Sequence, residues 1–217
     1  MKSEHLFNDL EEYRNAKEMK AYFDYIYEST RSDQELMKQA RLKKGKYKQF
    51  FEEFYPLYLY SQSLYCNENS RMRIVLGNQQ YDAIVIQPDG IEERFEFTSY
   101  IDGEWEFQDA KKLNERGYGD IRFNYRSSLD ERDQEYINKI RKNAVKKSTK
   151  DYSEVNLMFV VNTLDYFEIY GRESNEFVRI LKDEILNIKF KTRRIFLLVL
   201  NTQGVENIDQ NLYLLQE

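Results

Sequence analysis

Apolar side chains in the first third of the chain follow the spacing of helices. Through residues 1–66 they recur at intervals of three and four, which places them on one side of a helix. The S-x-x-E sequence from Ser32 to Glu35 has the form of a capping box, so we expect a second helix to start there. We predict a third helix through Phe50 to Ser61, bent by Pro56.

The middle of the chain changes to short apolar runs with a period of two. This pattern predicts three strands, at residues 72–77, 81–86 and 94–100. Between the last two stands Pro88-Asp89-Gly90, where proline presets φ and glycine accepts a positive φ. We therefore expect those two strands to pair as a hairpin.

The remaining half alternates helical and strand patterns. We expect a short helix flanked by loops within residues 102–125, and a basic helix over 130–150. Two continuous apolar runs, 155–163 and 194–201, predict buried strands on either side of a helix near 175–189. A strand, helix, strand unit of this kind forms a parallel pair. No linker or repeat divides the chain, so we predict one α/β domain over residues 1–217.

Composition narrows the possible chemistry. The chain is 41% hydrophobic and 33% charged with a net charge of −5, as in folded, well-solvated proteins. With no apolar run near the roughly 20 residues of a membrane span and no signal-peptide core at the N-terminus, we expect a cytoplasmic protein. One cysteine, Cys66, and one histidine, His5, exclude a Cys/His zinc site and argue against a hydrolase triad. Carboxylates remain plentiful, and these suit Mg²⁺.

Two carboxylates on the predicted hairpin are the main candidates for a site. Asp82 shares a strand face with apolar residues, an unusual place for an acid that binds nothing. Glu96 lies on the face of its strand opposite Phe95 and Phe97. Thirteen residues separate the two acids, a distance that a hairpin can close to present both to one cation. The plainer interpretation, two solvent-facing or ion-paired acids on an ordinary hairpin, stays open.

This organisation resembles the PD-(D/E)xK restriction-endonuclease-like superfamily, whose core is a helix, a three-stranded meander, a helix and a further strand. The resemblance covers about residues 45–201, leaving 1–44 as a helical N-terminal extension and 202–217 as a C-terminal tail. It implies that Asp82 and the acid of Glu96-Phe97-Thr98 bind Mg²⁺ or Mn²⁺ and activate water. It also assigns Glu53 as an additional acid. The Pro88-Asp89 pair is too close to Glu96, with only six residues between them, and it is needed as the turn.

The chain departs from the superfamily pattern at Thr98, where the resemblance calls for a lysine. Threonine cannot supply the positive charge that stabilises the attacking water. Some members carry this lysine on the following helix, and Lys147 is the candidate. At about 100° per residue it falls about 45° from the middle of the apolar stripe of that helix, whereas Lys146 points almost oppositely. A lysine that only lays its stem along the helix edge is the alternative.

Basic clusters suggest a polyphosphate partner. The lysines that we select for nucleic-acid contact are Lys43, Lys44, Lys46, Lys142 and Lys146. The leading hypothesis is a divergent Mg²⁺-dependent endonuclease that acts on DNA, with RNA also open as the substrate and a homodimer open as the assembly. The alternatives are a catalytically inactive nucleic-acid or protein binding module of the same fold, and an interaction protein built around the aromatic N-terminal helices.

Overall fold

The computed structural model describes residues 3–99, 103–119, 129–162, 174–200 and 208–217. Its contacts group the chain into two compact units. The first comprises Met1–Gly77, Ala83–Ile91 and Ile101–Phe123, and the second Asn78–Asp82, Glu92–Tyr100 and Asn124–Glu217. The α/β class is confirmed, because both units contain strands as well as helices. No helix among the described residues is both long and apolar enough to span a membrane.

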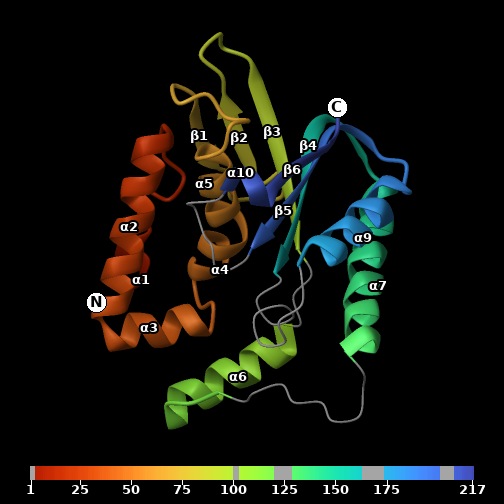
Figure 1. The fold of residues 1–217 in the computed structure, drawn as a ribbon. Coiled ribbons are helices and arrows are strands. Elements are labelled where there is room, and N and C mark those ends of the chain that lie inside the picture. Colours follow the sequence, from red (N-terminus) through yellow and green to blue (C-terminus); the bar gives the residue numbers. More distant parts are fainter. Residues whose placement is uncertain (1–2, 100–102, 120–128, 163–173, 201–207) are drawn as a thin grey trace. The chain divides into compact units, whose positions relative to one another are not determined.

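The first unit is mainly helical, as predicted. Its helices are α1 (Ser3–Leu6), α2 (Ala16–Ser32), α3 (Gln34–Arg41), α4 (Tyr47–Gln49), the π-helix η1 (Phe50–Phe54), α5 (Tyr55–Ser61) and α6 (Gly103–Arg116). They are drawn from red to yellow-green in Figure 1. Aromatic rings form much of the core, with Phe23 stacked on Tyr58 at 4.7 Å between ring centroids. Strands β1 (Arg71–Ile74) and β2 (Ala83–Ile86) pair antiparallel.

One local prediction in this unit was wrong in detail. The N-cap of α3 is Asp33, whose side chain accepts from the amides of Glu35 and Leu36, and Ser32 belongs to the end of α2. The aspartate carboxylate is the stronger acceptor, and it stands one residue closer to the first free amides. Pro56 lies in the first turn of α5 after a π-helical turn, where its missing amide hydrogen costs little.

The hairpin turn has the geometry that its sequence predicts. The amide of Gln87 donates to the carbonyl of Ile91 at 2.9 Å, and Gly90 has φ +85°. That φ lies in the region open to glycine and disfavoured for other residues. The Pro88-Asp89 pair is therefore part of the turn.

The second unit is a sheet covered by two long helices. Its elements are β3 (Glu92–Ser99), α7 (Leu129–Ser148), β4 (Asp151–Asn162), α9 (Ser174–Leu186), β5 (Lys191–Leu200), α10 (Ile208–Asn211) and β6 (Leu212–Gln216). β3, β4 and β5 are mutually parallel neighbours, and β6 is antiparallel to β5. The predicted parallel strand, helix, strand unit is thus confirmed. The segment 202–217, predicted to be a tail, instead contributes α10 and an edge strand.

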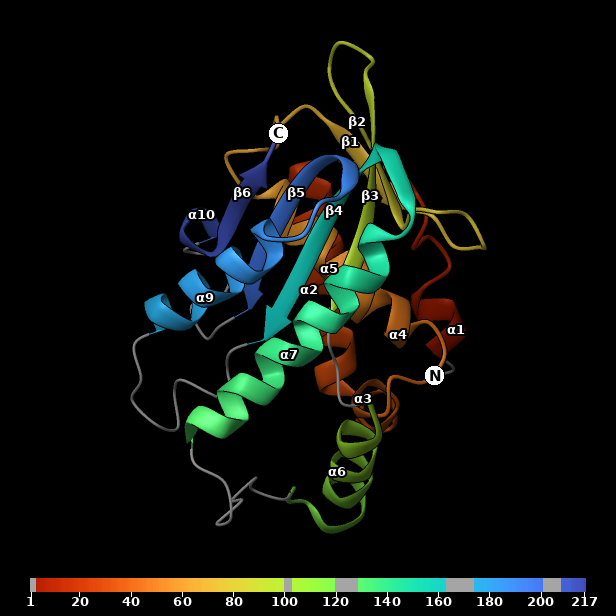
Figure 2. The same ribbon diagram turned by 90° about the vertical axis from the view of Figure 1, so that its right-hand side faces the viewer.

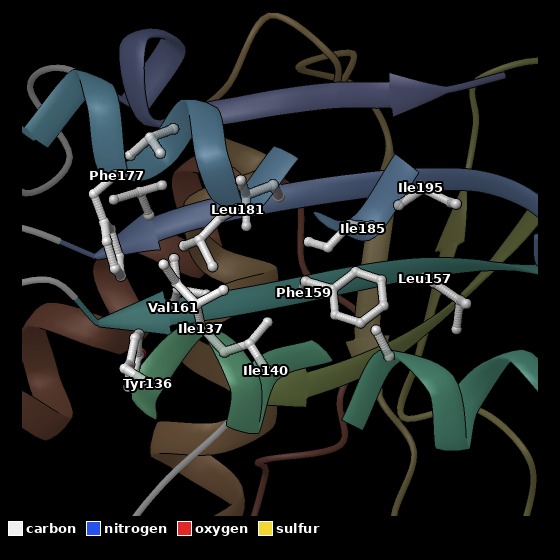
Figure 3. Packing of buried hydrophobic residues seen from close by; sticks show 14 of the residues in the cluster. Tyr136, Ile137, Ile140, Leu157, Phe159, Val161, Phe177, Leu181, Ile185 and Ile195 are labelled. Carbon is white, nitrogen blue, oxygen red and sulfur yellow. The ribbon is translucent and has the colours of Figure 1, made fainter. Parts of the chain in front are cut away.

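Figure 2 shows α7 and α9 side by side across one face of this sheet. Between them and the strands lies a cluster of buried apolar side chains (Figure 3). Ile140 and Ala144 supply the apolar side of α7, as predicted, and Leu157 and Phe159 face them from β4. This packing fixes α7 over the sheet, so it also fixes where the polar side chains at the margin of the helix can reach.

Candidate active site on β3 and α7

Asp82 is anchored to β3 at both its backbone and its side chain. Its amide donates to the carbonyl of Phe95 at 2.7 Å, and its carboxylate Oδ2 accepts from the amide of Phe97 at 2.8 Å. These two bonds lie on either side of Glu96 in the sequence. The carboxyl groups of Asp82 and Glu96 therefore occupy one small region of the second unit.

Glu96 lies on the face of β3 that α7 covers. In the parallel register it is opposite Leu157, which belongs to the apolar cluster beneath α7. From α7, the ammonium group of Lys147 donates to Glu96 Oε1. The side chains of Lys147 and Glu96 are only 18% and 13% exposed, so this ion pair is largely shielded from water. The inward direction predicted for Lys147 is confirmed, while Lys146 is exposed.

The site contains two carboxylates, those of Asp82 and Glu96, and Lys147 can neutralise only one of them. Burial and, to a lesser extent, the charge of Glu96 raise the pKa of Asp82 to about 6, against the opposing effects of the Phe97 amide and Lys147. Burial alone would lower the pKa of Lys147, but the hydrogen bond to Glu96 and the charges of Glu96, Tyr152 and Asp82 together outweigh it, and the pKa is raised. An ionised Asp82 is thus destabilised by its surroundings, and an added cation would relieve that cost.

Three further polar groups border the site, and the sequence analysis assigned none of them a role there. Asn143, four residues before Lys147 on α7, donates from Nδ2 to the carbonyl of Ser99 at 3.4 Å. The buried ring of Tyr152 has its centroid 5.9 Å from Lys147 Nζ. Thr98 is half-buried on the same face of β3 as Glu96. The four-residue spacing of Asn143 and Lys147 was the one signal that would have indicated a shared helix side.

The donor set suits Mg²⁺ better than a cation that needs a complete protein cage. Among the residues that the structure describes, no group of three or more His, Cys, Asp or Glu side chains is arranged to hold a metal. Mg²⁺ is commonly bound by one or two carboxylates, with waters and substrate phosphates completing its octahedron. Asp82 and Glu96 fit that pattern.

Glu53 belongs to a different compact unit from the other site residues. It lies half-buried in η1 of the first unit, whereas Asp82, Glu96 and Lys147 all belong to the second. Its assignment as an additional acid stays a prediction.

The lysines selected for nucleic-acid contact differ in how free they are. Lys43 forms ion pairs with Glu106 at 2.8 Å and with Glu52 at 3.6 Å. Lys46 donates to the carbonyl of Phe7 at 3.1 Å. Lys44 is exposed, and so are Lys142 and Lys146 on α7. The two α7 lysines are thus better placed for an external partner than Lys43 or Lys46.

Comparison with known proteins found no similar protein. No protein-family model matches the chain, and no curated protein and no solved structure is significantly similar to it.

Proposed function

We propose that the chain is a divergent Mg²⁺-dependent nuclease that hydrolyses DNA phosphodiesters with a metal-activated water. The observation that carries the proposal is the position of Lys147, whose ammonium group reaches Glu96 from α7. A positive charge is thereby supplied to the site although Thr98 occupies the position of the strand lysine. The superfamily resemblance remains part of this proposal.

Each residue of the site has a distinct part in the proposed reaction. Asp82 and Glu96 would hold the cation through their carboxylates. Mg²⁺ bound there would lower the pKa of a water and neutralise charge on the scissile phosphate. Lys147 would orient that water and stabilise the negative charge that develops on the phosphate oxygens. Glu53 is not needed for this assignment.

One observation favours the alternative, a catalytically inactive binding module of the same fold. The ammonium group of Lys147 bonds the same Glu96 carboxylate that a metal would use. In an inactive member, this ion pair would simply neutralise a shielded acid. The two functions therefore differ in whether a divalent cation displaces Lys147 from Glu96.

Cleavage assays with a matched pair of double variants test the proposal. Purified protein is incubated with plasmid, linear and single-stranded DNA in Mg²⁺ or Mn²⁺. We expect Asp82→Ala/Glu96→Ala to abolish cleavage, and Glu154→Ala/Asp183→Ala, which removes two exposed acids of the same unit, to retain it. Circular dichroism establishes that both variants are folded.

The possible outcomes separate the hypotheses. Cleavage that survives in Asp82→Ala/Glu96→Ala would show that the activity comes from elsewhere. If the wild type cleaves nothing but shifts DNA in a salt-dependent manner, the binding module is favoured, because phosphate contacts weaken steeply with salt.

A further inference from the structure

The two flanks of α7 have different surroundings. At about 100° per residue, Asn143, Lys146 and Lys142 follow one another round the helix on one side of Lys147. Asn143 and Lys147 both reach β3, so this is the β3 flank. Arg141 lies about 120° from Lys147 in the other direction and pairs with Glu184 of α9 at 3.4 Å. The α9 flank is thus closed by a neighbouring helix.

Beyond this flank, on the side of α7 that faces away from the apolar cluster, lysines form a row. Lys142 and Lys146 are four residues apart, which places them one above the other at a rise of about 6 Å. Lys150 follows Lys146 by four residues, in the turn after α7, where its amide donates to the carbonyl of Lys147 at 3.1 Å. All three side chains are exposed. We call Lys142, Lys146 and Lys150 the lysine row.

Among the described residues, the lysine row has no acidic partner, although the protein carries a net charge of −5. Three other basic residues of α7 have acidic partners: Lys139 pairs with Glu135 at 2.5 Å, Arg141 with Glu184, and Lys147 with Glu96. Within the described part of the chain, no acidic group pairs with a member of the row, although the sequence contains 38 Asp and Glu residues. Intramolecular ion pairing therefore does not account for these three charges.

The helix dipole accounts for only part of the row. Cations are favoured in the last turn of a helix, which covers Lys146. Lys142 lies six residues before Ser148, the last residue of α7, and is too far from the end for this effect. A role outside the chain explains the whole row more simply.

We infer that the lysine row binds consecutive phosphates of one nucleic-acid strand and guides that strand along α7 to Lys147 and Glu96. The spacing of about 6 Å between Lys142 and Lys146 is close to the separation of successive phosphates in an extended strand. Lys146 points about 100° round the helix from Lys147, so a strand held by the row runs along the outer side of α7, next to the residue that reaches Glu96. The delivery of the strand to a site of hydrolysis rests on the proposed function. The binding of the strand by the lysine row does not.

Binding measured without a divalent cation isolates the row from the chemistry. Fluorescence anisotropy of labelled single-stranded DNA, and of a duplex of the same sequence, is followed in EDTA over a range of KCl concentrations. The test variant is Lys142→Gln/Lys146→Gln/Lys150→Gln. The matched control is Lys17→Gln/Lys111→Gln/Lys189→Gln, three exposed lysines that lie far apart in the sequence, with the same total charge change.

We expect the row variant to bind about tenfold or more weakly at low salt, while the control stays close to wild type. Its plot of log affinity against log salt should be shallower by about two for a single strand, at about 0.7 for each phosphate that a lysine no longer neutralises. For a duplex the change should approach three, at about 0.9 for each such phosphate. The DNA whose binding weakens more is the form that the row prefers.

Three results would overturn the inference: no DNA binding by the wild type, equal weakening in the two variants, or an unchanged salt slope in the row variant. Failure of the row is distinguishable from failure of the proposed hydrolysis. If the wild type binds through the row but never cleaves, the row stands and the nuclease proposal fails. If the wild type cleaves DNA and the row variant binds DNA as tightly as the wild type, the nuclease proposal stands and the lysine row fails.

Discussion

The ammonium group of Lys147 on α7 donates to the carboxylate of Glu96 on β3, and the charges of both act on Asp82. Two acids and one cation thus share a largely shielded region. Lys147 and a divalent cation would compete for Glu96, since both are attracted to the same carboxylate. Because of this competition, a variant of Lys147 should affect the affinity for the cation and the rate of cleavage in different ways.

Replacing Lys147 with methionine should change cation binding and cleavage in opposite directions. Lys147→Met removes the competing charge, so we expect Mn²⁺, followed by electron paramagnetic resonance, to bind more tightly. Cleavage at saturating DNA should fall by about a hundredfold, because a positive charge aimed at the transition state is removed. Without a cation the variant should also unfold about 1–3 kcal/mol more easily, since Glu96 loses its partner.

Lys189→Met is the control for this experiment. It makes the same substitution at an exposed lysine of the same unit, outside the site and the lysine row, and its stability should stay within about 0.5 kcal/mol of wild type. Weaker Mn²⁺ binding by a folded Lys147→Met protein would contradict the competition. Undiminished cleavage would contradict the role given to Lys147.

The buried parallel strands were the most predictable part of the fold. The apolar runs in β4 and β5 are long enough that only a strand covered on both faces, or a buried helix, accounts for them, and the flanking helical patterns decide between the two. β6 was missed because LYLLQ is too short to show a period. The predicted end of β1 was too late, since the amide of Leu76 bonds the side chain of Glu11 instead of continuing the strand.

At the site, helix geometry was predictable and contacts between distant segments were not. The inward direction of Lys147 follows from its angle to the apolar stripe of α7. The bond from the Phe97 amide to Asp82 depends on how two segments are aligned, which local sequence does not specify. The proximity of the Tyr152 ring to Lys147 could not be predicted for the same reason, because nothing in the sequence around Tyr152 indicates this contact.

The N-cap of α3 offers a direct test of the corrected helix start. Asp33→Ala should destabilise the protein by about 0.5–2 kcal/mol, because the amides of Glu35 and Leu36 lose their acceptor. Ser32→Ala should change the stability by less than about 0.5 kcal/mol, since its hydroxyl bonds only the carbonyl of Ser29. Urea unfolding of both variants measures the difference, and a larger effect at Ser32 would restore the original capping box.

The turn before β3 should depend on the backbone conformation of Gly90. Gly90→Ala should cost about 1 kcal/mol because φ is +85°, even though an added methyl group would contact nothing within 4 Å. Gly103→Ala, at the first residue of α6, meets equally open space without a positive φ and should be neutral or slightly stabilising. Equal unfolding midpoints for the two variants would show that the turn carries no backbone strain.

Asp82 should make the stability of the metal-free protein depend on pH. Its pKa is raised from 3.8 to about 6 by burial and by Glu96, so the folded state binds this proton more tightly than the unfolded chain does. Its contribution to stability is therefore unfavourable above about pH 6, and the cost disappears as the pH falls toward about 4. At 1.36 kcal/mol per pKa unit the cost is at most about 3 kcal/mol.

Asp82→Asn should remove this cost, because its amide oxygen can still accept from Phe97 but the side chain cannot ionise. In EDTA we expect urea unfolding to show the variant more stable than wild type by about 1–3 kcal/mol at pH 8 and nearly equal to it at pH 4. Asp183→Asn, an exposed aspartate on α9, should stay within about 0.5 kcal/mol at both pH values. A gain of equal size at both pH values would point to better packing, and a decrease at pH 8 would mean that Lys147 and the Phe97 amide outweigh burial and Glu96.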